Sequence, residues 1–248
     1  MKNNNLVLVT ITAIAVGVLF SCKKKEDEIK KEDPPYSCTS CNTTPEASSA
    51  YDASNKGVYK GVIIGSSGTI KFALANNDTT ITAVMVLDGI TTNLTSTVKV
   101  VSGQTYIAPF TGVLNGQAVS INFSVDATGQ NPVITSSTIP GHPNSTFTLL
   151  KETSSALIEC FEGNYSTTRP ETGTFNMVLS RTLKKYKGSS RKTGGTPNAP
   201  FTGTINANNE LIDDAKGTNI GKISGDNFSN SFVDGAGSTV TINGKRTF

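Results

Sequence analysis

The chain has 248 residues, of which 36% are hydrophobic and 17% are charged, and 22 Lys and Arg against 19 Asp and Glu give a formal charge of +3. This length allows one sizeable core or two smaller ones, and the near-neutral charge gives no reason to expect nucleic acid as a partner. One histidine and four cysteines argue against histidine-based hydrolysis and against a zinc site.

Residues 1–21 have the layout of an export signal. Lys2 supplies a positive charge, and residues 6–20 are an apolar run that ends at Leu19-Phe20-Ser21-Cys22. The run is shorter than the roughly twenty residues of a membrane-spanning helix. Residues 19–22 resemble the lipobox of bacterial lipoproteins, which has an aliphatic residue three before the cysteine and a small residue directly before it. The resemblance covers residues 1–22 and implies cleavage before Cys22 after a diacylglycerol is attached to its sulfur. An uncleaved signal anchor is the alternative.

Residues 22–45 predict a lipidated, disordered tether. After Cys22 come five lysines and five acidic residues, which end at Pro34-Pro35, and such a mixed-charge segment has no core to bury. It resembles the acidic tags that direct some lipoproteins to the cell surface, and Lys23 stands where an inner-membrane retention signal has aspartate. These resemblances imply a protein anchored in membrane lipid by palmitate-type acyl chains, in the outer membrane with surface exposure. The covalent lipid on Cys22 is the only cofactor expected.

The remaining cysteines are Cys38, Cys41 and Cys160. Cys38 and Cys41 have the spacing of a redox pair or of half a zinc site, but they lie in a Ser/Thr/Asn-rich run rather than at the start of a helix. We therefore predict a local disulfide between them, formed in an oxidising compartment. Cys160 is then expected to be a buried free thiol, with pairing to Cys38 or Cys41 as the alternative.

Repeated motifs predict that residues 46–151 and 152–248 are two copies of one unit. Five motifs recur in the same order: Glu46–Ala50 and Glu152–Ala156, Gly57–Tyr59 and Gly163–Tyr165, Gly68–Leu74 and Gly173–Leu179, Ala108–Gly112 and Ala199–Gly203, Ser145–Leu149 and Ser238–Ile242. A short helix is expected at the start of each copy. Ser49–Asp52 fits a capping box and Ala156–Phe161 has an apolar face.

The rest of each copy alternates apolar and polar residues with period two, as in residues 70–74, 119–125 and 175–179, which predicts strands with one buried face. Asn115-Gly116, Asp88-Gly89 and Asn243-Gly244 are expected to form turns between strands. The predicted fold is mainly β, an antiparallel sandwich or barrel built from two duplicated meander halves, with one core or two. The Gly-x-Tyr strands resemble lipocalin-like barrels, although the tryptophan usual there is missing.

Few residues carry recognisable chemistry. His142 lies between prolines in a loop, where a solvent-facing ring is the simplest interpretation. Glycoside hydrolysis needs two facing carboxylates. The closest acidic pair, Asp213-Asp214, consists of adjacent residues and is better interpreted as a turn. A basic strip with one aromatic ring follows Leu179 and consists of Arg181, Lys184, Lys185, Tyr186, Lys187, Arg191 and Lys192. It could bind an anionic ligand, or it could be a solvated hairpin tip.

Together these features predict a membrane-anchored lipoprotein of the cell envelope that binds or scaffolds without catalysis. Its expected partners are a glycan, an anionic lipid or another envelope protein. The alternatives are a carbohydrate-active enzyme that uses Asp or Glu carboxylates, and a purely structural subunit of an envelope complex with a flat apolar patch.

Overall fold

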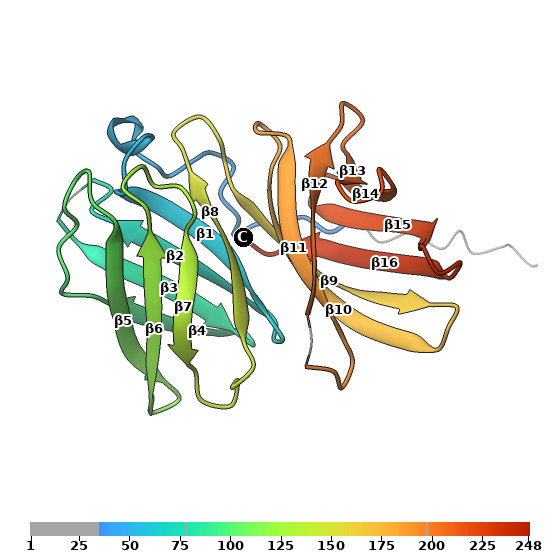
Figure 1. Cartoon of the computed structure of the whole chain (residues 1–248), viewed down its shortest axis with the longest axis horizontal. Helices are drawn as coiled ribbons and strands as arrows, with labels where there is room; N and C mark the ends of the chain where they lie inside the picture. Colours follow the sequence, from blue (N-terminus) through green and yellow to red (C-terminus); the bar gives the residue numbers. More distant parts are fainter. Residues whose placement is uncertain (1–34, 78, 197) are drawn as a thin grey trace, which may run out of the picture. The chain divides into compact units, whose positions relative to one another are not determined.

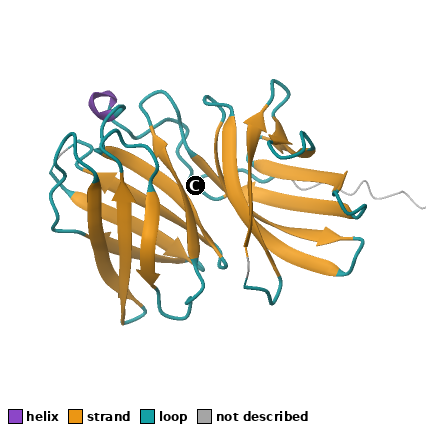
Figure 2. Ribbon diagram, viewed as in Figure 1, coloured by secondary structure: helices purple, strands orange, loops and turns teal. Residues whose placement is uncertain are grey.

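Sixteen antiparallel strands in two sheets make up the described chain (Figures 1 and 2). The structure is a computed structural model that describes residues 35–77, 79–196 and 198–248. The predicted signal, the predicted lipidation site Cys22 and the predicted tether up to residue 34 lie outside these residues. The mainly β, antiparallel fold predicted from the sequence is confirmed, and each half of the chain forms a sheet of its own.

The first sheet is an eight-stranded meander whose first strand pairs with both the second and the last. The strand order is β7-β6-β5-β4-β3-β2-β1-β8, so β7 and β8 each have one neighbour and the sheet stays open between them. Its strands are β1 (Gly57–Ile64), β2 (Gly68–Leu74), β3 (Ile81–Leu87), β4 (Ile90–Thr95), β5 (Tyr106–Leu114), β6 (Gln117–Val125), β7 (Val133–Thr138) and β8 (Thr146–Glu152).

The second sheet is a closed eight-stranded barrel whose strands again pair in chain order. Here the seventh and eighth strands, β15 and β16, do pair, and β16 also pairs with β9 to close the ring. Its strands are β9 (Glu159–Thr167), β10 (Glu171–Ser180), β11 (Lys185–Lys192), β12 (Asn198–Ile205), β13 (Glu210–Asp213), β14 (Asn219–Ser224), β15 (Asn227–Val233) and β16 (Thr239–Arg246).

The repeated sequence motifs mostly occupy equivalent strands. The Gly-x-Tyr motifs lie on the first strand of each sheet, the Gly68 and Gly173 motifs on the second, and the Ser145 and Ser238 motifs lead into the last. The Ala-Pro-Phe-Thr-Gly motifs do not correspond, because one lies on the fifth strand (β5) and the other on the fourth (β12) of its sheet.

Each sheet encloses an apolar core on its concave side. In the first sheet Phe72 packs edge-to-face on Phe110 with ring centroids 4.9 Å apart, and it also contacts Phe123 at 4.5 Å. In the barrel Phe175 packs on Phe228 at 5.4 Å, and side chains from most strands fill the interior. The period-two pattern of the sequence therefore describes the core-facing positions correctly.

Strand β1 is buried on both faces. Tyr59 and Ile63 point into the first core, whereas Val62 and Ile64 point outward and pack against Cys160 and Val178 on the outer face of the barrel and against Ile158 before it. A third apolar cluster therefore joins the two sheets within the unit of residues 35–248.

Buried charge accompanies this third cluster. Lys60 on β1 is 1% exposed, and its Nζ lies 2.7 Å from Glu152 Oε2 and 3.0 Å from Glu46 Oε2. The Glu152 carboxylate is fully buried and also accepts hydrogen bonds from the backbone N–H groups of Glu46 and Ile158. Burial alone would raise the pKa of Glu46, but the neighbouring Lys71 and Lys60 outweigh it and lower that pKa.

Two of the predicted turns are confirmed and one is wrong. Asn115-Gly116 and Asp88-Gly89 connect neighbouring strands, and all four residues have the positive φ that a tight hairpin turn requires. Asn243-Gly244 lies inside β16 instead. A Cβ on Gly244 would come within 2.6 Å of the Phe175 ring, so this glycine serves close packing within the barrel.

The short helix expected before each half is also wrong. The first reduces to one turn of 3₁₀ helix, Ser49–Tyr51, whose Ser48 makes no side-chain cap. Asp52 does not cap a helix but accepts hydrogen bonds from the N–H and hydroxyl of Ser154. The second segment enters β9, and its residues are apolar because both faces are covered: Phe161 faces the barrel core and Cys160 faces the first sheet.

Candidate ligand-binding cleft

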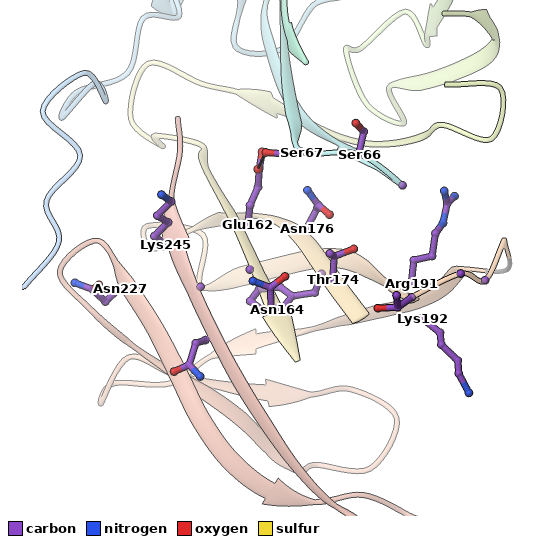
Figure 3. Close-up of a pocket in the computed structure, with 18 of the residues that line it drawn as sticks. Ser66, Ser67, Glu162, Asn164, Thr174, Asn176, Arg191, Lys192, Asn227 and Lys245 are labelled. Atoms are coloured by element: carbon purple, nitrogen blue, oxygen red, sulfur yellow. Dashed lines mark hydrogen bonds between the residues drawn. The ribbon is translucent and has the colours of Figure 1, made fainter. Parts of the chain in front are cut away.

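A polar cleft of about 750 Å³ lies between the β1–β2 turn and the outer surface of the barrel. The turn contributes Ser66 and Ser67, while strands β9, β10, β11 and β16 supply the floor (Figure 3). Tyr36, at the start of the described chain, also contributes to the lining.

The floor is a grid of outward-facing polar side chains, because alternate residues of neighbouring strands share a face. Two rows of the grid cross four paired strands in register. They are Lys245, Glu162, Asn176 and Ser189 in one row, and Asn243, Asn164, Thr174 and Arg191 in the next. Apart from Ser189, all of these residues line the cleft.

A smaller groove of about 350 Å³ continues the grid along the barrel. It shares Asn164, Thr174 and Asn243 with the main cleft and adds a third row that contains Ser166 and Thr172. Residues of one face repeat about every 6.7 Å along a strand, so three rows offer a polar strip on the order of 13 Å long, enough for a ligand larger than a single small ring.

Asn176 is the most buried polar residue of this floor. It is 2% exposed, yet its side-chain amide makes no hydrogen bond to any described residue, and Figure 3 shows it beneath Ser66 and Ser67. Its neighbour Ser189 on β11 is 5% exposed, and its hydroxyl is likewise without a partner among the described residues. Neither amide atom of Asn176 is among the fully buried side-chain atoms that lack a partner, so this amide reaches the open volume of the cleft and can hydrogen-bond to a group that enters it.

Glu162 is the one carboxylate among the described residues that line the cleft. Its Oε2 accepts a hydrogen bond of 2.6 Å from the Ser67 hydroxyl, which connects the β1–β2 turn to the barrel. Burial raises the pKa of Glu162, and the hydrogen bonds from Ser67 and its neighbours offset only part of that effect.

Three cations line the cleft, but they are not equivalent. Lys192 Nζ lies 3.1 Å from Glu171 Oε2 outside the cleft, and in Figure 3 its side chain extends away from that of Arg191. Lys245 lies over the ring of Tyr36 at 5.2 Å, and neither it nor Arg191 forms an ion pair with any described residue. Burial lowers the pKa of Arg191.

The basic strip expected after Leu179 is divided among several environments. Tyr186 points into the barrel core and is 2% exposed, because it lies between the outward-facing Lys185 and Lys187 on β11. Arg181 is bound to the carboxylate of Glu159, and Lys184 occupies a turn with φ of 51°. Of the seven residues, Arg191 and Lys192 alone line the cleft.

Cys38 and Cys41 are joined by a disulfide with Cα atoms 5.4 Å apart. The segment that carries it lies along the barrel: Tyr36 donates to the carbonyl of Arg246, and the N–H of Cys38 donates to Asp226. Cys160 is a buried free thiol, and burial raises its pKa well above the usual range.

The other candidate groups are used by the fold. Asp213 and Asp214 lie at the β13–β14 turn, where Asp213 accepts the N–H of Lys216 and Asp214 accepts the hydroxyl of Thr202. His142 Nε2 lies 3.5 Å from Asp88 Oδ2. Glu159 and Asp226 line another pocket, and Arg246 forms ion pairs with both of these carboxylates.

The sequence interpretation missed Glu162, Asn164, Asn176 and Lys245, and it assigned Asn243 to a turn. A signal was nevertheless present. Asparagine is depleted in strands, yet it recurs on the polar side of strands whose apolar side was recognised. Such out-of-place amides on one face of a sheet indicate a surface selected for hydrogen bonding.

No family model, no curated protein and no solved structure matches this chain significantly. The fold defines the chain as a pair of eight-stranded up-and-down β-sheets, one open and one closed. Among residues 35–77, 79–196 and 198–248, no helix is long and apolar enough to cross a membrane. The same residues contain no cluster of three or more His, Cys, Asp or Glu that could hold a metal.

Proposed function

We propose that this chain is a lipid-anchored protein of the cell envelope that binds an oligosaccharide in the cleft beside Asn176. The lipobox-like residues 19–22 support the anchor. The polar grid on the barrel supports the ligand class, since it consists largely of amides and hydroxyls.

The observation that carries the proposal is the state of Asn176, which is 2% exposed and has no hydrogen-bond partner in the described chain. An amide offers two donors and one acceptor side by side. Sugar hydroxyl groups both donate and accept, so they can satisfy an amide in either direction. Asn164 and Asn243 repeat the same chemistry in the neighbouring row.

Binding is favoured over the alternative of a carbohydrate-active enzyme. Glycoside hydrolysis uses two carboxyl groups on either side of the scissile bond, and Glu162 has no second carboxylate beside it among the described lining residues. The Ser67 hydroxyl donates to Glu162, but a nucleophilic serine normally requires a histidine base.

The test of binding uses the full chain purified from membranes in detergent, probed on a glycan array and then by calorimetry with the best oligosaccharide. Asn176→Ala should weaken binding about 10-fold or more, while the free energy of unfolding changes by less than about 1 kcal/mol because no described hydrogen bond is lost. Asn208→Ala, at an exposed turn, is the matched control and should bind normally. A chain that binds no glycan would contradict the proposal.

The anchor is tested separately by Cys22→Ala, since only this thiol can carry the lipid. Metabolic labelling with a fatty-acid analogue should mark the parent chain and not the variant, and the variant should leave the membrane fraction. Normal acylation of the variant would disprove the anchor.

A further inference from the structure

Arg191 is held in place by contacts from several parts of the chain. Its Nε donates to Asn198 Oδ1 at 2.7 Å, and its Nη2 donates to the carbonyl of Asn144 at 2.7 Å. Its guanidinium also fills the space beside Gly65, where a Cβ would collide with it. The guanidinium is therefore fixed at the edge of the cleft before any ligand arrives.

This fixed cation has no anionic partner. No described Asp or Glu lies within ion-pair distance of Arg191, and Nη1 has no acceptor among the described residues. Partly buried charges in proteins are usually paired. An arginine has five N–H donors, and Arg191 lines the cleft with donors that no described residue uses.

The charges of the cleft point to a ligand with one negative charge. Lys192 is paired with Glu171 outside the cleft. The cleft lining then holds two cations without an ion pair, Arg191 and Lys245, and one carboxylate, Glu162, which leaves an excess of one positive charge. Arg191 is also the register neighbour of Thr174, next to Asn164 in the same row. An anion at Arg191 would therefore be continuous with the amides and hydroxyls of the floor.

We propose that the ligand of this cleft is an acidic oligosaccharide and that Arg191 binds its carboxylate as a fork. This proposal rests on the proposed function and specifies the ligand class of the same site. A carboxylate carries a single charge and matches the planar geometry of the guanidinium. A phosphate group would carry about −1.5 to −2 charges, which is more than the cleft balances.

The test compares acidic glycans with their methyl esters, because esterification removes the charge and leaves the rest of the sugar unchanged. A panel of uronate- and sialate-containing oligosaccharides, each with its methyl ester, and of neutral, sulfated and phosphorylated oligosaccharides is titrated against the full chain in detergent. We expect at least one free acid to bind about 10- to 100-fold more tightly than its ester, and the preference to shrink as salt is raised.

Variants identify the residue responsible. Arg191→Gln should abolish the preference for the free acid, and Arg191→Lys should restore only part of it, because an ammonium cannot form the bidentate pair. Lys222→Gln removes the same charge from an exposed position on β14 and should leave the preference intact. The comparison of acid with ester uses the parent chain, so it holds even if Arg191→Gln folds poorly.

Each result is decisive. Equal binding of acid and ester, or a preference that survives Arg191→Gln, would overturn the role of Arg191 while leaving oligosaccharide binding in place. Preference for sulfated or phosphorylated sugars would overturn the proposal that the anionic group of the ligand is a carboxylate. Binding of no glycan at all would overturn the proposed function and this inference together.

Discussion

Removal of the Lys60 charge should destabilise the chain strongly. In Lys60→Met the side chain keeps its approximate length, but Glu152 loses the ammonium 2.7 Å from its Oε2 and remains fully buried. Removing one partner of a buried ion pair costs about 3–5 kcal/mol. Glu152 keeps two backbone N–H donors, from Glu46 and Ile158, so we expect the lower end, about 3 kcal/mol.

The assay is urea unfolding of the full chain in detergent, followed by circular dichroism because the sequence has no tryptophan. Lys71→Met is the control: Lys71 Nζ lies 2.8 Å from Glu46 Oε1, but its side chain is 26% exposed, so its loss should cost less than about 1 kcal/mol. The double variant Lys60→Met with Glu152→Gln should recover part of the stability, because no unpaired charge is then buried.

Two outcomes would refute this reasoning. One is a loss for Lys60→Met that is no larger than the loss for Lys71→Met. The other is a double variant, Lys60→Met with Glu152→Gln, that is no more stable than Lys60→Met alone, because the neutral amide should leave no unpaired charge buried.

Three further predictions concern titratable side chains. Burial raises the pKa of Glu162, so the proton stabilises the folded chain fully below the unfolded value near 4.5, and this stabilisation is lost as the pH rises through the folded value. Glu162→Gln should therefore raise the urea midpoint at neutral pH and lose that advantage near about pH 4. Burial also raises the pKa of Cys160, so iodoacetamide should label this thiol, as read by mass spectrometry, only after unfolding. Neutralising Lys184, Lys185 and Lys187 together should change the free energy of unfolding by less than about 1 kcal/mol in the same urea assay, because none of them forms an ion pair with a described residue.

The corresponding negative results are equally clear. A Glu162→Gln advantage that is independent of pH would mean that the carboxyl does not titrate differently in the folded chain. Rapid labelling of Cys160 in the native state would show that the third apolar cluster opens readily. A large loss for the lysine triple variant would mean that the β10–β11 tip is structural.

The sequence predicted the fold class well because strand faces are a local property. Alternation placed Phe72 and Phe175 on core faces, and Asn115-Gly116 specified a turn through its own backbone preference. The expected helix at Ala156–Phe161 was wrong for a tertiary reason. Apolar residues there cover two different surfaces, the barrel core and the first sheet, and a strand buried on both faces cannot be distinguished from a short helix by its pattern alone.

The candidate site could be predicted only in part. Arg191 and Lys192 were recognised as members of a basic run, but proximity in sequence does not decide which face of β11 a residue occupies. Tyr186 belongs to the opposite face and lies in the core. The cleft depends on pairing between β16, β9, β10 and β11, and Lys245 lies 83 positions from Glu162. No local pattern in the sequence specifies that contact.

Because β7 and β8 do not pair, the two sheets should differ in how readily they open locally. In the barrel every strand has two neighbours, so opening it requires the loss of a complete ladder, which ranges from three residue pairs between β12 and β13 to nine between β9 and β10. In the first sheet β7 is bound along one side only, and it contains no charged residue or proline to protect its edge. Amide hydrogen exchange should therefore be fastest in β7 and slowest in β9 and β10, with local opening of the first sheet well below the cost of global unfolding. Uniform protection across both sheets would show that the unpaired edge of β7 opens no more readily than the paired strands of the barrel.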